Sequence, residues 1–313
     1  MYLHIDVALT ETAIADDFAA ALAARELPEK FFYWFPRSVQ AWLALCGEGE
    51  YRNFSRSYQL VEHHASDLAR HARRKHAEVV SLGAGQGDKD RLVLAALAAA
   101  RKSIAYRPVD ASQALLEIAV RDALAAGFET RGLKADLMDA AHVAPLRGAL
   151  GEHHRVFLLL GNTLGGFDPF AVARRVAGLM VDGDVAVIDG ELFAGEETLA
   201  GYDNPLNRRF AFAPLAAAGI SPDDGTLEFG IERDAERDGL YRVTKHFTAA
   251  RDVRMLVAGE TVALAPGERI AMSASHKYDE DTFLTILREA ALVPIATYRS
   301  RDGNFLMTVV GRG

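Results

Sequence analysis

The chain has 313 residues, of which half are hydrophobic and a quarter are charged, a composition typical of a globular protein with a large core. Its formal charge of −8 argues against nucleic-acid binding, and no apolar run reaches the roughly 18–20 residues of a membrane-spanning helix. The single cysteine, Cys46, excludes an intrachain disulfide, and the N-terminus lacks a secretion-signal pattern, so we expect a cytoplasmic location.

The first part of the chain is predicted to be helical. Apolar residues at three- and four-residue spacing predict a helix over 11–25, capped by Thr10, and two further helices over 37–46 and 58–75. The densest aromatic cluster, Phe31-Phe32-Tyr33-Trp34-Phe35, lies between the first two helices. Such a cluster is expected either to fill a core or to contact a ligand.

From residue 78 onward, short apolar runs alternate with helical stretches, as in a parallel sheet covered by helices on both faces. The strands are predicted over 78–82, 103–109, 130–135, 156–160 and 184–188, and the helices over 88–101, 112–126 and 169–180. A helix over 282–291 and strands over 295–299 and 305–310, around the turn sequence Asp302-Gly303-Asn304, are predicted to end the chain.

The alternation lapses between about Gly195 and Ser275, where shorter patterns predict an inserted, β-rich subdomain. We therefore predict an α/β domain built from residues 58–194 and 276–313. A second domain, of α+β type, would combine the N-terminal helices, residues 1–57, with the insertion, residues 195–275.

The first predicted strand of the α/β domain runs into Gly83-Ala84-Gly85-Gln86-Gly87 and then into a helix that begins at Asp88. A dinucleotide-binding turn has a third glycine where this chain has Asp88, whose carboxylate would repel a diphosphate. The turn suits S-adenosylmethionine (SAM) better, because that ligand has a sulfonium and no pyrophosphate. An NAD-dependent oxidoreductase is the less favoured alternative.

Polar residues also follow the next three strands. Asp110 ends the second strand, where a carboxylate can accept both ribose hydroxyls or cap the helix that starts near Ser112, two roles that are compatible. Asp136 ends the third strand and is assigned either to an adenine amino group or to a turn. The glycine-rich stretch from Leu160 to Pro169 follows the fourth strand, at the edge where open α/β sheets bind their ligands.

With these features in place, the chain resembles the histidine-specific, SAM-dependent N-methyltransferases of ergothioneine biosynthesis, and the resemblance covers most of its length. The motifs that carry it are Leu27-Pro28-Glu29-Lys30-Phe31-Phe32-Tyr33, Glu50-Tyr51, Leu82-Gly83-Ala84-Gly85 with Lys89, Val109-Asp110-Ala111, Ala135-Asp136, Leu160-Gly161-Asn162-Thr163-Leu164-Gly165 with Pro169, Gly201-Tyr202-Asp203, and Gly267-Glu268 through Ser275-His276-Lys277-Tyr278.

The resemblance implies a Rossmann-like methyltransferase domain with SAM as cofactor, S-adenosylhomocysteine (SAH) as product and a small molecule as methyl acceptor. The cofactor-binding positions that it implies are Gly83, Ala84, Gly85, Lys89, Asp110, Ala111, Asp136, Leu137, Gly161, Asn162 and Thr163. Tyr33, near the reacting centre in the family, is the candidate catalytic residue. The acceptor-binding positions that it implies are Tyr51, Gly166, Tyr202, Ser273 and Ser275.

Two positions depart from the family. Gly166 stands where the family has an asparagine that orients the substrate amino group, and Ser273 stands where it has a glutamate that helps to read the imidazole ring. Losing both contacts predicts weaker selection of histidine, so nitrogen of another amino acid or azole is the expected acceptor. A catalytically inactive SAM- or SAH-binding regulatory homologue is the alternative.

No metal site is predicted, because the pairs His63-His64 and His153-His154 consist of neighbours, which face different ways on a helix or strand. We expect no nucleic-acid or membrane partner, and the sequence leaves the oligomeric state open.

Overall fold

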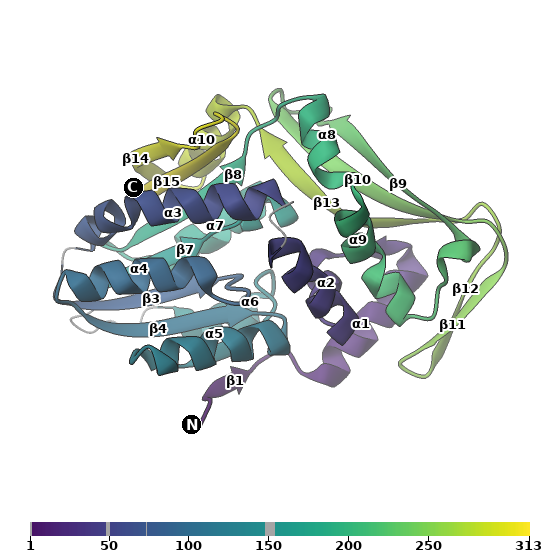
Figure 1. Ribbon diagram of the computed structural model, residues 1–313, viewed down its shortest axis with the longest axis horizontal. Coiled ribbons are helices and arrows are strands. Elements are labelled where there is room, and N and C mark those ends of the chain that lie inside the picture. Colours follow the sequence, from purple (N-terminus) through teal and green to yellow (C-terminus); the bar gives the residue numbers. More distant parts are fainter. Residues whose placement is uncertain (1, 48–50, 73, 148–153) are drawn as a thin grey trace. The chain divides into compact units, whose positions relative to one another are not determined.

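The computed structural model describes residues 2–47, 51–72, 74–147 and 154–313, and the chain divides into two compact units (Figure 1). The first unit comprises Met1–Ala8, Asn53–Phe193 and His276–Gly313. The second comprises Leu9–Arg52 and Ala194–Ser275. The N-terminal residues belong to the first unit, and not to the second as the sequence suggested, because strand β1 pairs with β6.

The first unit is built on a mixed sheet with the order β1-β6-β4-β3-β7-β8-β15-β14, in which β5 also pairs with β4. Strand β15 is antiparallel to β8 and β14, and the other pairs are parallel. The strands are β1 (Ile5–Val7), β3 (His76–Leu82), β4 (Ser103–Asp110), β5 (Glu129–Thr130), β6 (Gly132–Lys134), β7 (His154–Leu159), β8 (Val185–Glu191), β14 (Leu292–Arg299) and β15 (Phe305–Arg312).

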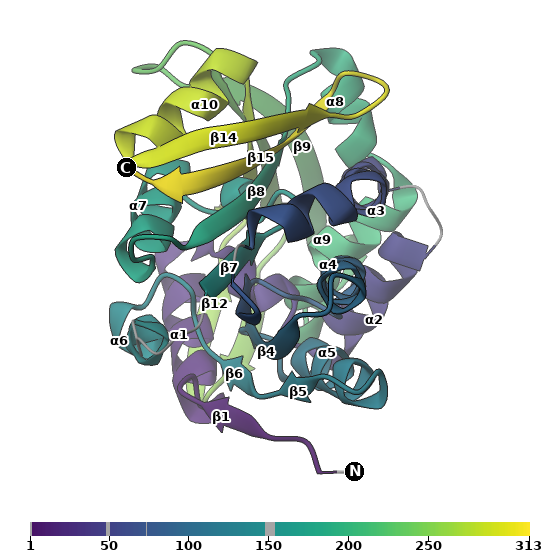
Figure 2. The same cartoon turned by 90° about the vertical axis from the view of Figure 1, so that its left-hand side faces the viewer.

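Helices cover both faces of this sheet, as Figures 1 and 2 show from two directions. One face carries α3 (Arg52–His71), α4 (Asp88–Ala99) and α5 (Gln113–Ala125), and the other carries α7 (Pro169–Leu179) and α10 (Glu280–Glu289). A short helix, α6 (Ala140–Val143), precedes β7. The central strands are buried on both sides, which explains their nearly continuous apolar sequences. The predicted α/β class is confirmed.

Strand order reverses between β3 and β7, because the chain proceeds outward from β3 to β4 and β6 and then returns to β7 on the other side. The carboxyl ends of strands at such a reversal form the crevice in which open α/β sheets bind ligands. The loops after β3, β4 and β7 are therefore the parts of this unit that matter most for function.

The second unit contains a four-stranded sheet, a hairpin and several helices. The sheet has the order β2-β13-β10-β9, and the antiparallel pair β11-β12 stands apart from it. Its helices α2 and α9 pack together, and the turn η1 contacts α9. Its elements are α1 (Glu11–Ala24), β2 (Glu26–Leu27), η1 (Glu29–Phe32), α2 (Pro36–Gly47), α8 (Glu196–Tyr202), α9 (Pro205–Ala217), β9 (Gly225–Arg233), β10 (Leu240–Ala249), β11 (Val253–Val257), β12 (Glu260–Leu264) and β13 (Arg269–Tyr278).

Some elements differ from the sequence prediction. The strand predicted over 130–135 consists of two short strands, β5 and β6, on either side of Arg131. Helix α3 begins at Arg52, not near residue 58. Strand β13 was not predicted, because its polar second half hides the alternation of buried Ile270 and Met272. Across the described parts of the chain, every helix is too short or too polar to cross a membrane.

Candidate functional site

The loop after β3 is built on glycines in left-handed conformations. Gly83 has a φ of +72° and Gly85 a φ of +56°, values that side chains with a Cβ rarely adopt. The backbone N–H groups of Gly83 and Ala84 donate to the Val109 carbonyl over 2.9 and 3.1 Å, so β4 anchors the loop. A Cβ added at Gly85 would meet no atom within 4 Å. The loop thus leaves bare backbone facing open space.

Asp110, the last residue of β4, holds this loop from the side. Its carboxylate accepts hydrogen bonds from the backbone N–H groups of Gly85 and Ser112, each over 2.8 Å. Helix α5 is capped by the Ser112 hydroxyl, which accepts from Leu115, and Asp110 accepts from the backbone N–H of that capping residue. Burial raises the pKa of Asp110 above its usual value, and the backbone hydrogen bonds oppose that shift. A carboxylate offers about four lone-pair sites, so it can still accept from a further donor.

The loop after β7 is held by β8. The Asp189 carboxylate accepts from the backbone N–H groups of Gly161 and Asn162 over 3.0 and 2.8 Å, and from the Ser57 hydroxyl. Asn162 is buried, and its side-chain oxygen accepts from the backbone N–H of Glu191 over 3.0 Å. Burial raises the pKa of Asp189. Asn162 thus fixes the loop to β8.

The loops after β3 and β7 lie against each other. A Cβ added at Gly83 would lie 2.8 Å from Thr163 Cγ2, closer than real Cβ contacts. The structure therefore brings Gly83, Gly85 and Asp110 together with the Gly161–Thr163 segment at one edge of the sheet.

Gly83→Ala is expected to destabilise the protein by about 1–2 kcal/mol through its left-handed backbone alone, with the Thr163 contact adding to this. Thr163→Ser removes the methyl group that contacts the new Cβ. The double variant Gly83→Ala with Thr163→Ser should therefore regain the stability lost to that contact, but not the stability lost to the left-handed backbone. Urea unfolding of the three proteins measures both contributions. A single Gly83→Ala variant as stable as the parent would show that the loop relaxes freely.

Beneath these loops lies a buried ionic cluster that the sequence analysis did not identify. The Glu191 carboxylate lies 2.8 Å from Lys277 Nζ and accepts from the Asn53 side-chain amide over 2.6 Å, with Arg56 at 3.3 Å. The available signal was two carboxylates, Asp189 and Glu191, in a strand whose other residues are apolar or glycine. In a fully buried strand such residues must have partners.

The other predicted cofactor positions lie around the same edge. Lys89 Nζ lies 4.7 Å from the centre of the Phe54 ring, and a Cβ added at Gly161 would lie 2.8 Å from that nitrogen. Asp136 accepts from the backbone N–H of Met138 over 2.9 Å. This hydrogen bond corresponds to the turn role, one of the two roles considered for Asp136 from the sequence. Two more predicted positions follow the strands, Ala111 half-buried after β4 and Leu137 buried after β6.

The second unit gathers most of the predicted acceptor residues into an aromatic cluster. The Tyr33 ring centre lies 5.1 Å from that of Trp42 and 5.4 Å from that of Phe210. Trp42 also contacts Tyr51, whose ring centre lies 6.2 Å from that of Tyr202. Gly166 is the exception among the predicted acceptor residues, because it belongs to the first unit.

Hydroxyl groups and one carboxylate lie at this aromatic cluster. The Tyr33 hydroxyl donates to Glu29 Oε1 over 2.9 Å, and the Ser273 hydroxyl donates to Glu29 Oε2. The Tyr202 hydroxyl and Ser275 Oγ lie 3.1 Å apart. Burial, and next the Glu29 charge, raise the pKa of Tyr33 well above its usual value, so its hydroxyl stays protonated at neutral pH. A carboxylate thus lies beside Ser273, where the sequence predicted that one had been lost.

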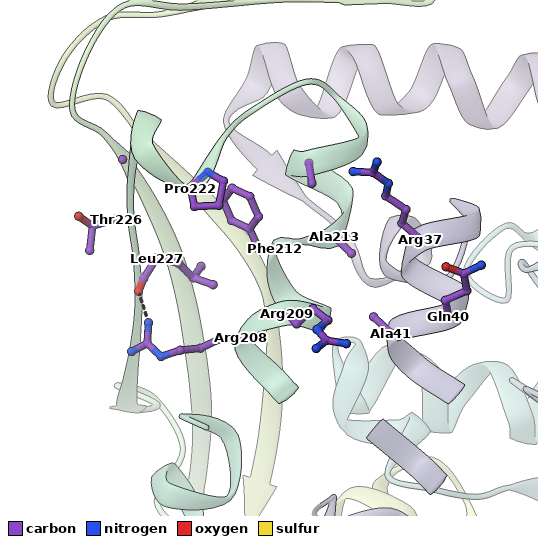
Figure 3. Close-up of a pocket in the computed structure, with 12 residues that line it drawn as sticks. Arg37, Gln40, Ala41, Arg208, Arg209, Phe212, Ala213, Pro222, Thr226 and Leu227 are labelled. Carbon is purple, nitrogen blue, oxygen red and sulfur yellow. Dashed lines mark hydrogen bonds between the residues drawn. The ribbon is translucent and has the colours of Figure 1, made fainter. Parts of the chain in front are cut away.

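The second unit also contains an open cavity of about 710 Å³ between α2, α9 and the start of β9 (Figure 3). Its walls include the apolar side chains of Phe212, Ala213 and Leu227, with Arg37 and Arg209 among the polar residues (Figure 3). None of the predicted site residues lines it.

Comparison with known proteins identifies a family. The family model described as histidine-specific methyltransferase, SAM-dependent, matches residues 14–205 and 235–312. The N-methyltransferase fsqC of Aspergillus fumigatus is 24% identical over 277 residues, which cover 85% of this chain and 74% of that protein. The N-methyltransferase imqF of Aspergillus flavus is 23% identical over 317 residues, covering 90% and 79%. A SAM-dependent methyltransferase structure from Clostridium acetobutylicum aligns with a TM-score of 0.45 and 12% identity, over 80% of this chain and 92% of that one.

Proposed function

We propose that this chain methylates a nitrogen atom of a small amino acid or azole-type molecule. The chain belongs to the histidine-specific, SAM-dependent methyltransferase family and is a SAM-dependent methyltransferase. Two similar proteins are N-methyltransferases, which supports nitrogen as the acceptor atom. The observation that carries the proposal is the junction of the Gly85 backbone with the Asp110 carboxylate at the reversal of strand order.

The residues at that junction fit the cofactor. Gly83, Gly85 and Gly161 have left-handed backbone conformations, and Gly85 borders open space, as a close backbone approach to a ligand requires. We assign the Asp110 carboxylate to the ribose hydroxyls, because a carboxylate forms charge-assisted hydrogen bonds with such donors. The other cofactor positions assigned are Ala84, Lys89, Ala111, Asp136, Leu137, Asn162 and Thr163.

When bound, SAM supplies an electrophilic methyl group to the acceptor nitrogen and leaves as the neutral thioether SAH. The protein's part is to align an acceptor with a free lone pair, and alignment alone contributes about 7–11 kcal/mol. Tyr33, Tyr51 and Tyr202 are assigned to hold the acceptor by ring contacts and hydroxyl hydrogen bonds. Since the Tyr33 hydroxyl stays protonated and donates its hydrogen to Glu29, we assign no base role to it.

Turnover tests this proposal. The protein is incubated with SAM that carries a labelled methyl group and with a panel of amino acids, azoles and phenols, histidine included. Label should appear on nitrogen of at least one amine or azole, with one SAH formed for each methyl group transferred. Binding of SAM without any transfer would favour the inactive regulatory homologue, and label on phenol oxygen alone would overturn the choice of nitrogen.

We also propose a cytoplasmic location. A single buried cysteine, Cys46, is typical of proteins in a reducing compartment, and fractionation of cells that make the native protein tests the assignment.

A further inference from the structure

Glu29 is an acidic residue beside the aromatic cluster, and no prediction assigned it a role. It opens η1 and is half-buried. Its two oxygens are held by different segments, Oε1 by the Tyr33 hydroxyl and Oε2 by the Ser273 hydroxyl of β13. These two hydrogen bonds fix the orientation of the carboxylate group, so the lone pairs that remain on its oxygens point in a defined direction.

No cation is paired with this carboxylate in the part of the chain that the structure describes. The neighbouring Lys30 pairs instead with Asp17 over 2.6 Å. Lys245 Nζ lies 4.6 Å from the centre of the Phe32 ring. Glu29 is thus balanced by two neutral hydroxyls only. A partly desolvated carboxylate without a counter-ion is costly, and a ligand that brings positive charge would remove that cost.

The surroundings favour the same ligand. A carboxylate offers about four lone-pair sites, and the two hydroxyls occupy one on each oxygen. The ring of Tyr33, whose hydroxyl donates to the carboxylate, packs against the ring of Trp42, and aromatic faces attract cations. An anion would meet Glu29 unfavourably, and a neutral alcohol would compete with water for the same lone pairs.

We propose that Glu29 is an acceptor-binding carboxylate that holds a hydrogen-bearing nitrogen of the substrate, either an ammonium group or an azole N–H. Tyr33 and Ser273 are its positioning residues. The inference rests on the proposed function in one respect, that the aromatic cluster receives the acceptor. The inference narrows the substrate class, because it requires the acceptor to carry an N–H group next to its apolar part.

Binding of three probes of equal size tests the inference without any need for turnover. Benzylamine, benzyl alcohol and benzoate share one ring and carry a positive, no and a negative charge at pH 7.5. Binding is followed by the fluorescence of Trp42 in a Trp34→Phe background, since the chain has two tryptophans. The parent should bind benzylamine at least tenfold more tightly than benzyl alcohol, and benzoate most weakly.

Glu29→Gln should reduce the preference for benzylamine over benzyl alcohol to less than threefold. Glu26→Gln is the matched control, because this exposed glutamate lies three residues earlier and should leave the preference unchanged. Ser273→Ala keeps the charge but removes one hydroxyl, so it should weaken benzylamine binding less than Glu29→Gln does.

A parent protein that binds the three probes equally, or a folded Glu29→Gln variant that keeps the preference, would overturn the inference. The first outcome needs no variant, so the inference stays testable even if Glu29→Gln does not fold. Either result leaves the proposed function to be judged by label transfer alone. If the parent protein transferred label to an amine but bound the three probes equally, the proposed function would stand and the inference about Glu29 would fall.

Discussion

Replacing Glu191 with alanine is expected to lower the free energy of unfolding by about 3–5 kcal/mol, because the substitution leaves a buried charge without its partner. The Lys277 side chain is only 1% exposed, and its Nζ lies 2.8 Å from the Glu191 carboxylate. Arg56 loses a partner at the same time. Urea unfolding measures the change, as a shift of the midpoint at an unchanged slope.

Two controls identify the cause. Glu197→Ala removes an ion pair with Arg52 in which both side chains are 52% exposed, and pairs of that kind contribute about 0–1 kcal/mol. Combining Glu191→Leu with Lys277→Met removes both buried charges, and this protein should be more stable than Glu191→Ala. If the double variant lost as much free energy of unfolding as the two single variants added together, the loss would come from packing and not from an unpaired charge.

The Asp110→Ala variant is expected to bind SAM and SAH at least tenfold more weakly than the parent. Hydrogen bonds to a charged group contribute about 1.5–3 kcal/mol each, and the substitution also frees the Gly85 backbone that Asp110 holds. Isothermal titration calorimetry with SAH measures the affinity. Asp122→Ala, on helix α5 and paired with Arg91, is the control and should change it by less than twofold.

The affinity of the parent for SAH should also fall as the pH is lowered. The ionised carboxylate of Asp110 accepts hydrogen bonds with both oxygens, and protonation converts one oxygen into a donor. Since burial raises the pKa of Asp110, this loss begins at a higher pH than an ordinary aspartate would give. Asp110→Asn should abolish this part of the pH dependence. An identical pH profile in parent and variant would assign the titration to another group.

Much of the first unit follows from local sequence patterns. Continuous apolar runs mark β3, β7 and β8, and the glycine loops after β3 and β7 lie where the sequence analysis placed them, since a left-handed turn restricts the choice of residue strongly. Strand β1 was missed because a three-residue edge strand is defined by its pairing with β6, where Ile5 pairs with Gly132, and not by its own pattern.

The site was harder to predict than the fold, because its side chains, like strand β1, depend on partners that are distant in the sequence. The roles of Asp189 and Glu191 depend on Ser57 and Lys277, which other segments of the chain supply. The contact between Glu29 and Ser273 joins residues that are 244 positions apart. Spacing along the chain carries no information about such pairs, although a charged residue in an apolar strand or an aromatic cluster marks where a partner must be sought.

The division of the chain has a consequence for engineering. Because the polypeptide passes from one unit to the other after Ala8, Arg52, Phe193 and Ser275, no continuous fragment consists of one complete unit alone. Grafting a new substrate preference from a relative would require exchanging residues 9–52 and 194–275 together. A chimera that replaces only one of them would mismatch position 29 with position 273.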